Sequence, residues 1–155
     1  MYTDVVSETK KRKRRPKADG NCYEAALVFA AYSVPDDERD RYRVVHGFPI
    51  GQGPIEGLKH GHAWVERTDD MPNLSSVPAE MAAHFTEMYE RNPELLITVI
   101  DKSNGKDLEM SRTVYYGFGN IDRSECTYYK VDEAMRLAVR YGHWGPWGEE
   151  PSGVV

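Results

Sequence analysis

The chain has 155 residues, of which 40% are hydrophobic and 29% are charged, and its formal net charge is −5. This length suits one domain, and the composition is typical of a globular protein rather than a collagenous or membrane protein. No apolar run is long enough to span a bilayer, and none follows the basic N-terminal residues as it would in a secretory signal. With two cysteines, Cys22 and Cys126, and no disulfide framework of the secreted kind, we expect a cytoplasmic protein without membrane contacts.

Positive charge is concentrated near the N-terminus. Seven of eight consecutive residues are basic, namely Lys10, Lys11, Arg12, Lys13, Arg14, Arg15 and Lys17. Outside these seven residues the chain has 13 basic and 25 acidic residues, so it carries a formal charge of −12. Because residues 1–18 have few apolar side chains to bury, we expect an extended basic arm before a folded domain over residues 19–155. The arm is suited to nucleic acid or to an acidic protein, or it is a solvated tail.

The first half of the domain predicts one helix and two strands. Asp19-Gly20-Asn21 suits a turn and an N-cap, and the Ala-rich, apolar residues 22–32 that follow predict a buried helix. Residues 42–47 predict a short strand, and the Gly- and Pro-rich segment 47–61 predicts a loop. That loop leads into a second predicted strand over residues 62–66.

The second half predicts two more helices and two more strands. A helix over residues 78–91 carries Met81, Phe85 and Met88 at helical spacing, which predicts a face buried in the core. Strands are predicted over residues 95–100 and 126–131, with a turn at 101–105 and a last helix over 133–141 capped by Asp132. This order predicts an α+β fold whose first helix packs on a mostly antiparallel sheet.

Three residues lie where a thiol-based site would need them. Cys22 falls in the first turn of a helix, where unpaired N–H groups and the helix dipole stabilise a thiolate and an oxyanion. His62 begins a strand directly after a loop, so its imidazole is expected at the sheet edge, ready to exchange a proton. Asp101 follows the next buried strand and could orient that imidazole. Together they predict that Cys22 is a nucleophile, that His62 is its general base and that Asp101 orients the imidazole.

These residues stand in motifs that resemble a known superfamily. Gly20-Asn21-Cys22, the string from Gly61 to Glu66 (GHAWVE) and Val99-Ile100-Asp101 resemble the Cys, His and Asp motifs of transglutaminase-like, papain-like proteins. The likeness covers about residues 19–147, which also resemble a group of bacterial and phage proteins, so a phage-encoded chain would act in the host cytoplasm. It implies a papain-like fold and a cysteine hydrolase or acyltransferase, such as a thiol protease. No cofactor or metal is expected.

Several assignments stay open at this stage. Asn104 or Asp107 could replace Asp101 as the third member, because the interval after His62 is longer than is usual in the superfamily. The expected oxyanion or substrate contacts are Asn21, Gln52 and Trp64, although a strand tryptophan is commonly core. Tyr115 and Tyr116 either border a substrate cleft or pack at the end of a strand.

Two other sites compete with this set. Ala18-Asp19-Gly20-Asn21-Cys22 also resembles the cysteine motif of ovarian-tumour-type deubiquitinases, in which His143 would supply the imidazole. His60, His62 and Glu66 lie at even spacing and are chemically compatible with zinc, although His60 is expected to be a solvated loop residue.

Two classes of function follow from the sequence. The first is an enzyme that attacks an amide-type bond of a protein or peptide through a thioester on Cys22. The second is a non-catalytic binding or accessory protein on the same scaffold, which docks through its basic arm. The oligomeric state is not predicted.

Overall fold

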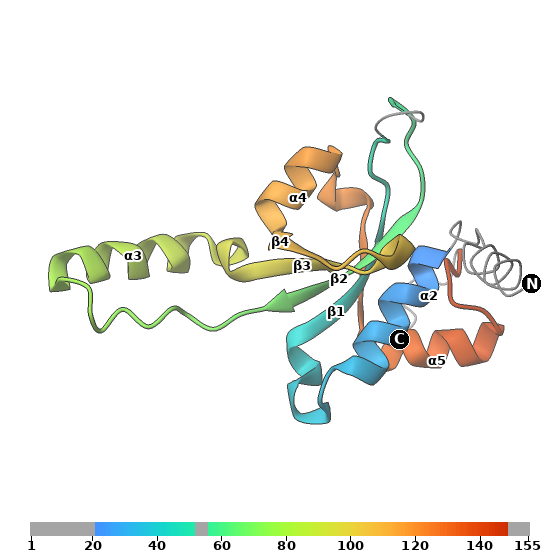
Figure 1. Ribbon diagram of the computed structural model, residues 1–155, viewed down its shortest axis with the longest axis horizontal. Helices are drawn as coiled ribbons and strands as arrows, with labels where there is room; N and C mark the ends of the chain where they lie inside the picture. Colours follow the sequence, from blue (N-terminus) through green and yellow to red (C-terminus); the bar gives the residue numbers. More distant parts are fainter. Residues whose placement is uncertain (1–20, 52–55, 149–155) are drawn as a thin grey trace, which may run out of the picture.

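A single antiparallel sheet forms the centre of the protein (Figure 1). The structure is a computed structural model that describes residues 21–51 and 56–148. Within these residues five strands pair in the order β4-β3-β2-β1-β5, every pair antiparallel. They are β1 (Tyr42–Gly47), β2 (His62–Thr68), β3 (Ile97–Asp101), β4 (Leu108–Ser111) and β5 (Thr127–Lys130). The predicted α+β class and antiparallel sheet are confirmed.

Helices cover both faces of this sheet. They are α2 (Asn21–Val28), α3 (Ala79–Arg91), α4 (Arg112–Gly119) and α5 (Val131–Tyr141). Short helical turns of other types lie at Phe29–Ser33, Asp36–Arg41, Pro93–Leu96, Ser103–Gly105 and Arg123–Glu125. In Figure 1, α4 lies on one side of the strands, and α2 and α5 lie on the other.

The two faces have separate cores because successive strand residues point to opposite sides. Val44 and Val65 point toward α2 and α5, where Leu27 and Leu137 join the same buried cluster. Their neighbours Val45 and Trp64 point the other way and pack with Tyr116 of α4, along with Val99. Each fully buried residue of this kind contributes roughly 1.5–3 kcal/mol, so the sheet is held firmly on both sides.

The first helix packs against the sheet as predicted, with one local difference. Ala26, Leu27 and Ala30 are buried, and α2 contacts β2 directly. The last part of the predicted helix is wound more loosely, as a π-helical segment over Phe29–Ser33. Asp19 and Gly20, the expected turn before the helix, lie outside the described residues.

The expectation that Met81, Phe85 and Met88 belong to the core is wrong. Figure 1 shows α3 projecting away from the end of the sheet, as the returning half of a long excursion between β2 and β3. None of its described residues is buried, and Met81 is 50% exposed. Spacing reveals that a helix has an apolar face, but it does not say what covers that face.

Several predicted boundaries in the second half also move. Leu95 and Leu96 form a helical turn before β3, and Asp101 is the last residue of β3 rather than the first of a turn. The last helix begins at Val131, and the Glu133 carboxylate accepts the backbone N–H of Lys130. Asp132, the predicted cap, instead forms an ion pair with Arg39.

Two elements were not predicted. The strand β4 and the helix α4 fill the interval between the predicted turn and the last strand. Helix α4 is held at its start by Ser111, whose hydroxyl accepts the N–H of Val114. The basic arm, residues 1–18, lies outside the described residues. No helix in the described ranges has both the length and the apolar character needed to cross a membrane.

Candidate active site

The structure brings Cys22, His62 and Asp101 to one end of the sheet. Cys22 is in the first turn of α2, His62 is the first residue of β2 and Asp101 is the last residue of β3. Because β2 and β3 run antiparallel, the start of one strand lies beside the end of the other. The register, with Val65 opposite Ile100, makes His62 and Asp101 diagonal neighbours on one face.

Asp101 is almost completely buried, and every bond it makes fixes its orientation. Its Oδ2 atom lies 3.1 Å from Nε2 of His62 and accepts the hydroxyl of Tyr115 at 2.7 Å. Its Oδ1 atom accepts the backbone N–H and the hydroxyl of Ser103, at 2.9 and 2.6 Å. Burial raises the pKa of this carboxyl, but the bonds from His62, Ser103 and Tyr115 outweigh it and hold the pKa well below its usual range.

The imidazole of His62 is held between Asp101 and Cys22. Its Nε2 atom faces the carboxylate, and the ring also makes a hydrogen bond with Cys22. Burial lowers the pKa of His62, but hydrogen bonds with Asp101 and Cys22 and the charges of both groups raise it to about 9. The imidazolium form therefore prevails at neutral pH. Cys22 is 8% exposed and lines the same cleft as His62.

Trp64 lies behind the imidazole rather than in front of it. The two ring centroids are 5.9 Å apart, and Trp64 has no exposed surface. Its indole N–H donates to Oε2 of Glu66 at 2.9 Å, and the Tyr116 hydroxyl donates to the same oxygen. Nε of Arg112 lies 3.4 Å from the other oxygen of Glu66. The expectation that Trp64 contacts substrate is therefore wrong, and its contact is with the back of the His62 ring.

A cleft of about 720 Å³ opens in front of Cys22 and His62. Its walls are mostly apolar and come from β4, from α4 and Ile121 just beyond it, and from the loop that precedes β2. The apolar side chains are Pro49, Ile50, Leu108, Met110, Phe118 and Ile121. Lys106 is the only Lys or Arg among the described lining residues, and its Nζ atom lies 4.0 Å from Oδ2 of Asp101.

The alternatives to Asp101 do not face His62. Asn104 lines the cleft in an exposed left-handed turn with φ of 54°, and no described hydrogen bond joins it to the imidazole. Asp107 forms an ion pair with Lys102. Gln52 and the side chain of Asn21, the expected oxyanion contacts, lie outside the described part of the structure, as does the arm over residues 10–17.

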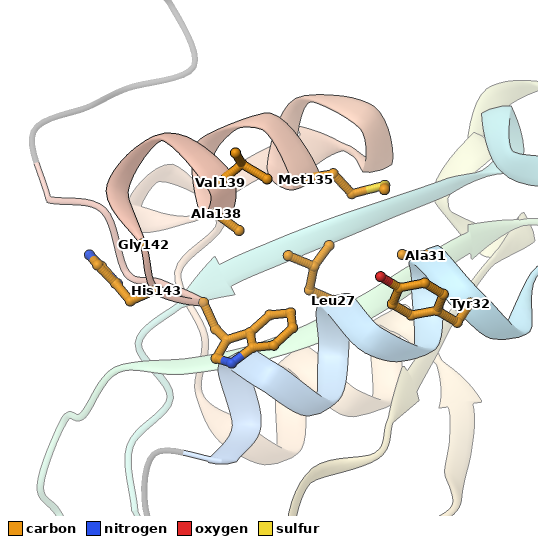
Figure 2. A pocket seen from close by; sticks show the side chains of 9 residues that line it. Leu27, Ala31, Tyr32, Met135, Ala138, Val139, Gly142 and His143 are labelled. Atoms are coloured by element: carbon orange, nitrogen blue, oxygen red, sulfur yellow. The ribbon is translucent and has the colours of Figure 1, made fainter.

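His143 belongs to a different pocket. It lies just after α5, in a hollow of about 380 Å³ between α5 and α2 that Leu27, Ala31 and Val139 also line (Figure 2). Its Nδ1 atom accepts the backbone N–H of Gly145 at 3.2 Å. His143 is not among the residues that line the cleft of Cys22, so the deubiquitinase-like pairing of these two residues does not form.

The zinc alternative also fails on geometry. Glu66 is occupied by Trp64, Tyr116 and Arg112, and the rings of His60 and His62 are 6.1 Å apart. Within residues 21–51 and 56–148, no group of three or more suitable side chains could hold a metal ion. His60 is half-buried and lines the cleft, so the expectation of a solvated loop residue is wrong.

Sequence reasoning missed Ser103 as a site residue and left Tyr115 open. Ser103 follows a buried strand by two residues, a spacing at which a hydroxyl readily bonds an aspartate, so it carried a weak local signal. Tyr115 lines the cleft, as one interpretation proposed, but from a helix rather than a strand end. Tyr116 is buried behind the site.

A scan against protein-family models and searches of the curated proteins and of the solved structures found nothing that matches this chain.

Proposed function

We propose that this protein is a cysteine-dependent hydrolase or acyltransferase that acts on an amide-type bond through a thioester on Cys22. The observation that carries the proposal is the arrangement of His62, whose Nε2 lies 3.1 Å from a fully bonded Asp101 while the same imidazole makes a hydrogen bond with Cys22. An imidazole held in this way between an acid and a thiol is the arrangement that thiol-based acyl transfer needs.

The first half of the proposed reaction forms the thioester. An imidazolium beside a sulfur favours the thiolate, which is the nucleophilic form. The Cys22 thiolate attacks the carbonyl carbon of the substrate, and His62 then donates its proton to the departing amine. Backbone N–H groups in the first turn of α2 are available to the oxyanion, since the first turn of a helix leaves them without helical partners.

The second half releases the acyl group. Neutral His62 removes a proton from water, or from an acceptor amine, as that molecule attacks the thioester carbonyl. The thiolate leaves, and the imidazolium is restored beside it. Asp101 keeps Nε2 protonated and the ring oriented in both halves, and Ser103 and Tyr115 keep Asp101 in place.

The resemblance to transglutaminase-like, papain-like proteins supports this proposal. The resemblance implies that the Cys motif begins a helix and that the His and Asp motifs lie on strands. Here Cys22 is in the first turn of α2, while His62 and Asp101 lie on the neighbouring antiparallel strands β2 and β3. We therefore extend the proposal to a papain-like fold, and to nucleic acid or an acidic protein as the partner of residues 10–17.

Alkylation of Cys22 by iodoacetamide, followed against pH by mass spectrometry, tests the nucleophile. We expect Cys22 to react faster than Cys126, because the imidazole of His62 lies beside it and can take its proton. His62→Ala should slow this reaction about tenfold or more. Cys126 is the matched control, because burial raises the pKa of its thiol and it should stay slow in both proteins.

Two results would contradict the proposal. Equal alkylation rates of Cys22 and Cys126 would contradict an activated nucleophile at Cys22. An activity or cellular effect that survives Cys22→Ala but disappears when residues 10–17 are deleted would favour a non-catalytic binding protein instead.

A further inference from the structure

The cleft in front of Cys22 is far larger and more apolar than the chemistry of the three site residues requires. Leu108 and Met110 alternate along β4, so both point from this edge strand into the cleft, and both are half-buried. Phe118 of α4 adds an aromatic side chain that is 71% exposed. Apolar side chains that surround a nucleophile without covering it are the usual lining of a small-molecule or acyl-group site.

From this lining we infer that the acyl group carried by Cys22 is apolar and extended, a fatty or aromatic chain rather than a short or charged one. The inference rests on the proposed function and names its substrate class. Cys22 and the apolar walls line one continuous cleft of about 720 Å³, so a group bound to the sulfur would lie against those walls. Each methylene that moves from water into such a wall contributes about 0.8 kcal/mol, which is about fourfold in affinity.

The charges around the cleft point the same way. Asp101 is the only carboxylate among its described lining residues, and both of its oxygens are already bonded. Its oxygens are therefore already engaged by these partners rather than free to bind a cationic acyl group. The amine of Lys106, whose side chain is 47% exposed, stands at the same cleft and would repel a second cation. A positively charged acyl chain should be the poorest substrate.

A series of p-nitrophenyl esters tests the inference on the full chain. The acetate, butyrate, hexanoate and octanoate esters each transfer their acyl group to the Cys22 sulfur, and p-nitrophenolate leaves. Water then cleaves the thioester to the free acid and the thiol. We expect kcat/KM, corrected for the Cys22→Ala background, to rise about two- to fourfold per methylene. The hexanoate ester with a terminal ammonium group should fall about tenfold or more below plain hexanoate.

A matched pair of variants on β4 localises the effect. Met110→Gln keeps the size of a side chain that faces the cleft but makes it polar, and it should lower the octanoate-to-acetate ratio of kcat/KM about fivefold or more. Glu109→Gln changes the neighbouring exposed residue, which is not among the lining residues, and should leave that ratio unchanged. Because the result is a ratio, partial loss of folded protein does not alter it.

The outcomes separate this inference from the proposed function. A flat dependence on chain length, a faster ammonium ester, or an unchanged ratio in Met110→Gln, with Cys22 acylated in each case, would overturn the apolar specificity alone. If mass spectrometry finds no acylated Cys22 with any ester, the proposed function and the inference are both overturned.

Discussion

Asp101 is the residue whose surroundings are most completely defined. The two carboxylate oxygens of Asp101 accept hydrogen bonds from the imidazole of His62, from the hydroxyl of Tyr115, and from the backbone N–H and the hydroxyl of Ser103. A buried carboxylate with this many donors is stabilised in its charged form, and charge-assisted bonds are stronger than neutral ones. Its charge and hydrogen bond, together with those of Cys22, raise the pKa of His62.

Replacing this charge should lower the pKa of His62. In Asp101→Asn the burial that lowers that pKa remains, while the charge and bond of the carboxylate that raise it disappear. The pKa should therefore fall below about 9, by an amount that the hydrogen bond and charge of Cys22, which remain, will limit. An NMR titration of the His62 ring protons measures the change.

Asp69→Asn is the control for that titration. Asp69 also bonds its neighbours, Arg67 and Thr98, but it does not touch His62. Its substitution should leave the His62 titration where it is. A pKa near 9 that persists in Asp101→Asn would assign the protonation of His62 to Cys22 alone.

At the scale of elements, strand β1 approaches the indole of Trp64 so closely that it needs a glycine. A Cβ atom at Gly47 would lie 2.6 Å from Cη2 of Trp64 and 2.8 Å from Sγ of Cys126. Trp64 is completely buried and bonded to Glu66, so it has little freedom to move aside. The position of Trp64, which packs against the His62 ring, therefore depends on the absence of a side chain at residue 47.

Gly47→Ala should destabilise the protein by about 1–3 kcal/mol, because it overpacks this contact. Gly117→Ala is the matched control in α4, where an added Cβ atom would meet nothing within 4 Å. In that helix the change should be neutral or stabilise by up to about 1 kcal/mol. Urea unfolding of both variants gives the comparison, and equal midpoints would contradict the close packing at Gly47.

Helix α3 gives the second element-scale prediction. Because Met81 is 50% exposed on a projecting helix, Met81→Ser should change the free energy of unfolding by no more than about 0.5 kcal/mol. Leu27→Ala, in the core between α2 and the sheet, should cost about 2–5 kcal/mol. Urea unfolding measures both values, and a large loss in Met81→Ser would mean that this face of α3 is covered in solution.

The stability of the whole molecule should depend on pH through two histidines with opposite shifts. His46 is enclosed by the rings of Tyr23, Tyr129 and Trp147, and burial lowers its pKa from 6.5 to about 4. Its folded-state pKa lies below the unfolded value, so its neutral form is favoured and stability is lost as the pH falls from 6.5 through 4. The pKa of His62 is raised to about 9, so its contribution is complete below 6.5 and is lost as the pH rises through 9.

We therefore expect the free energy of unfolding to be greatest near pH 6.5 and to fall on both sides. The acid side should lose about 3 kcal/mol to His46, since one pKa unit corresponds to about 1.4 kcal/mol. Urea unfolding at a series of pH values tests the profile. In His46→Phe the loss between pH 6.5 and 4 should shrink, and an NMR titration of His46 in the unmodified protein checks the cause directly. A His46 pKa near 6.5 would contradict this account.

Much of this arrangement followed from the sequence by itself. Short runs rich in β-branched and aromatic residues, bounded by a Gly- and Pro-rich segment, predicted β1 with its observed bounds and the start of β2, because strand composition and turn residues are local properties. Local position also placed Cys22 in the first turn of a helix and His62 at the start of a strand. The same reasoning missed α4, whose two glycines and paired tyrosines are weak helix formers, and β4, which is only four residues long.

Only the tertiary structure decided which groups meet. The register between β2 and β3 brought Asp101, rather than Asn104 or Asp107, to the imidazole, and the packing of α4 brought Tyr115 to the same carboxylate. It also placed α3 away from the core and left an apolar cleft open in front of Cys22. The physical reason is that periodicity and capping depend on neighbours along the chain, whereas a hydrogen-bond partner or a covered face depends on how distant elements pack.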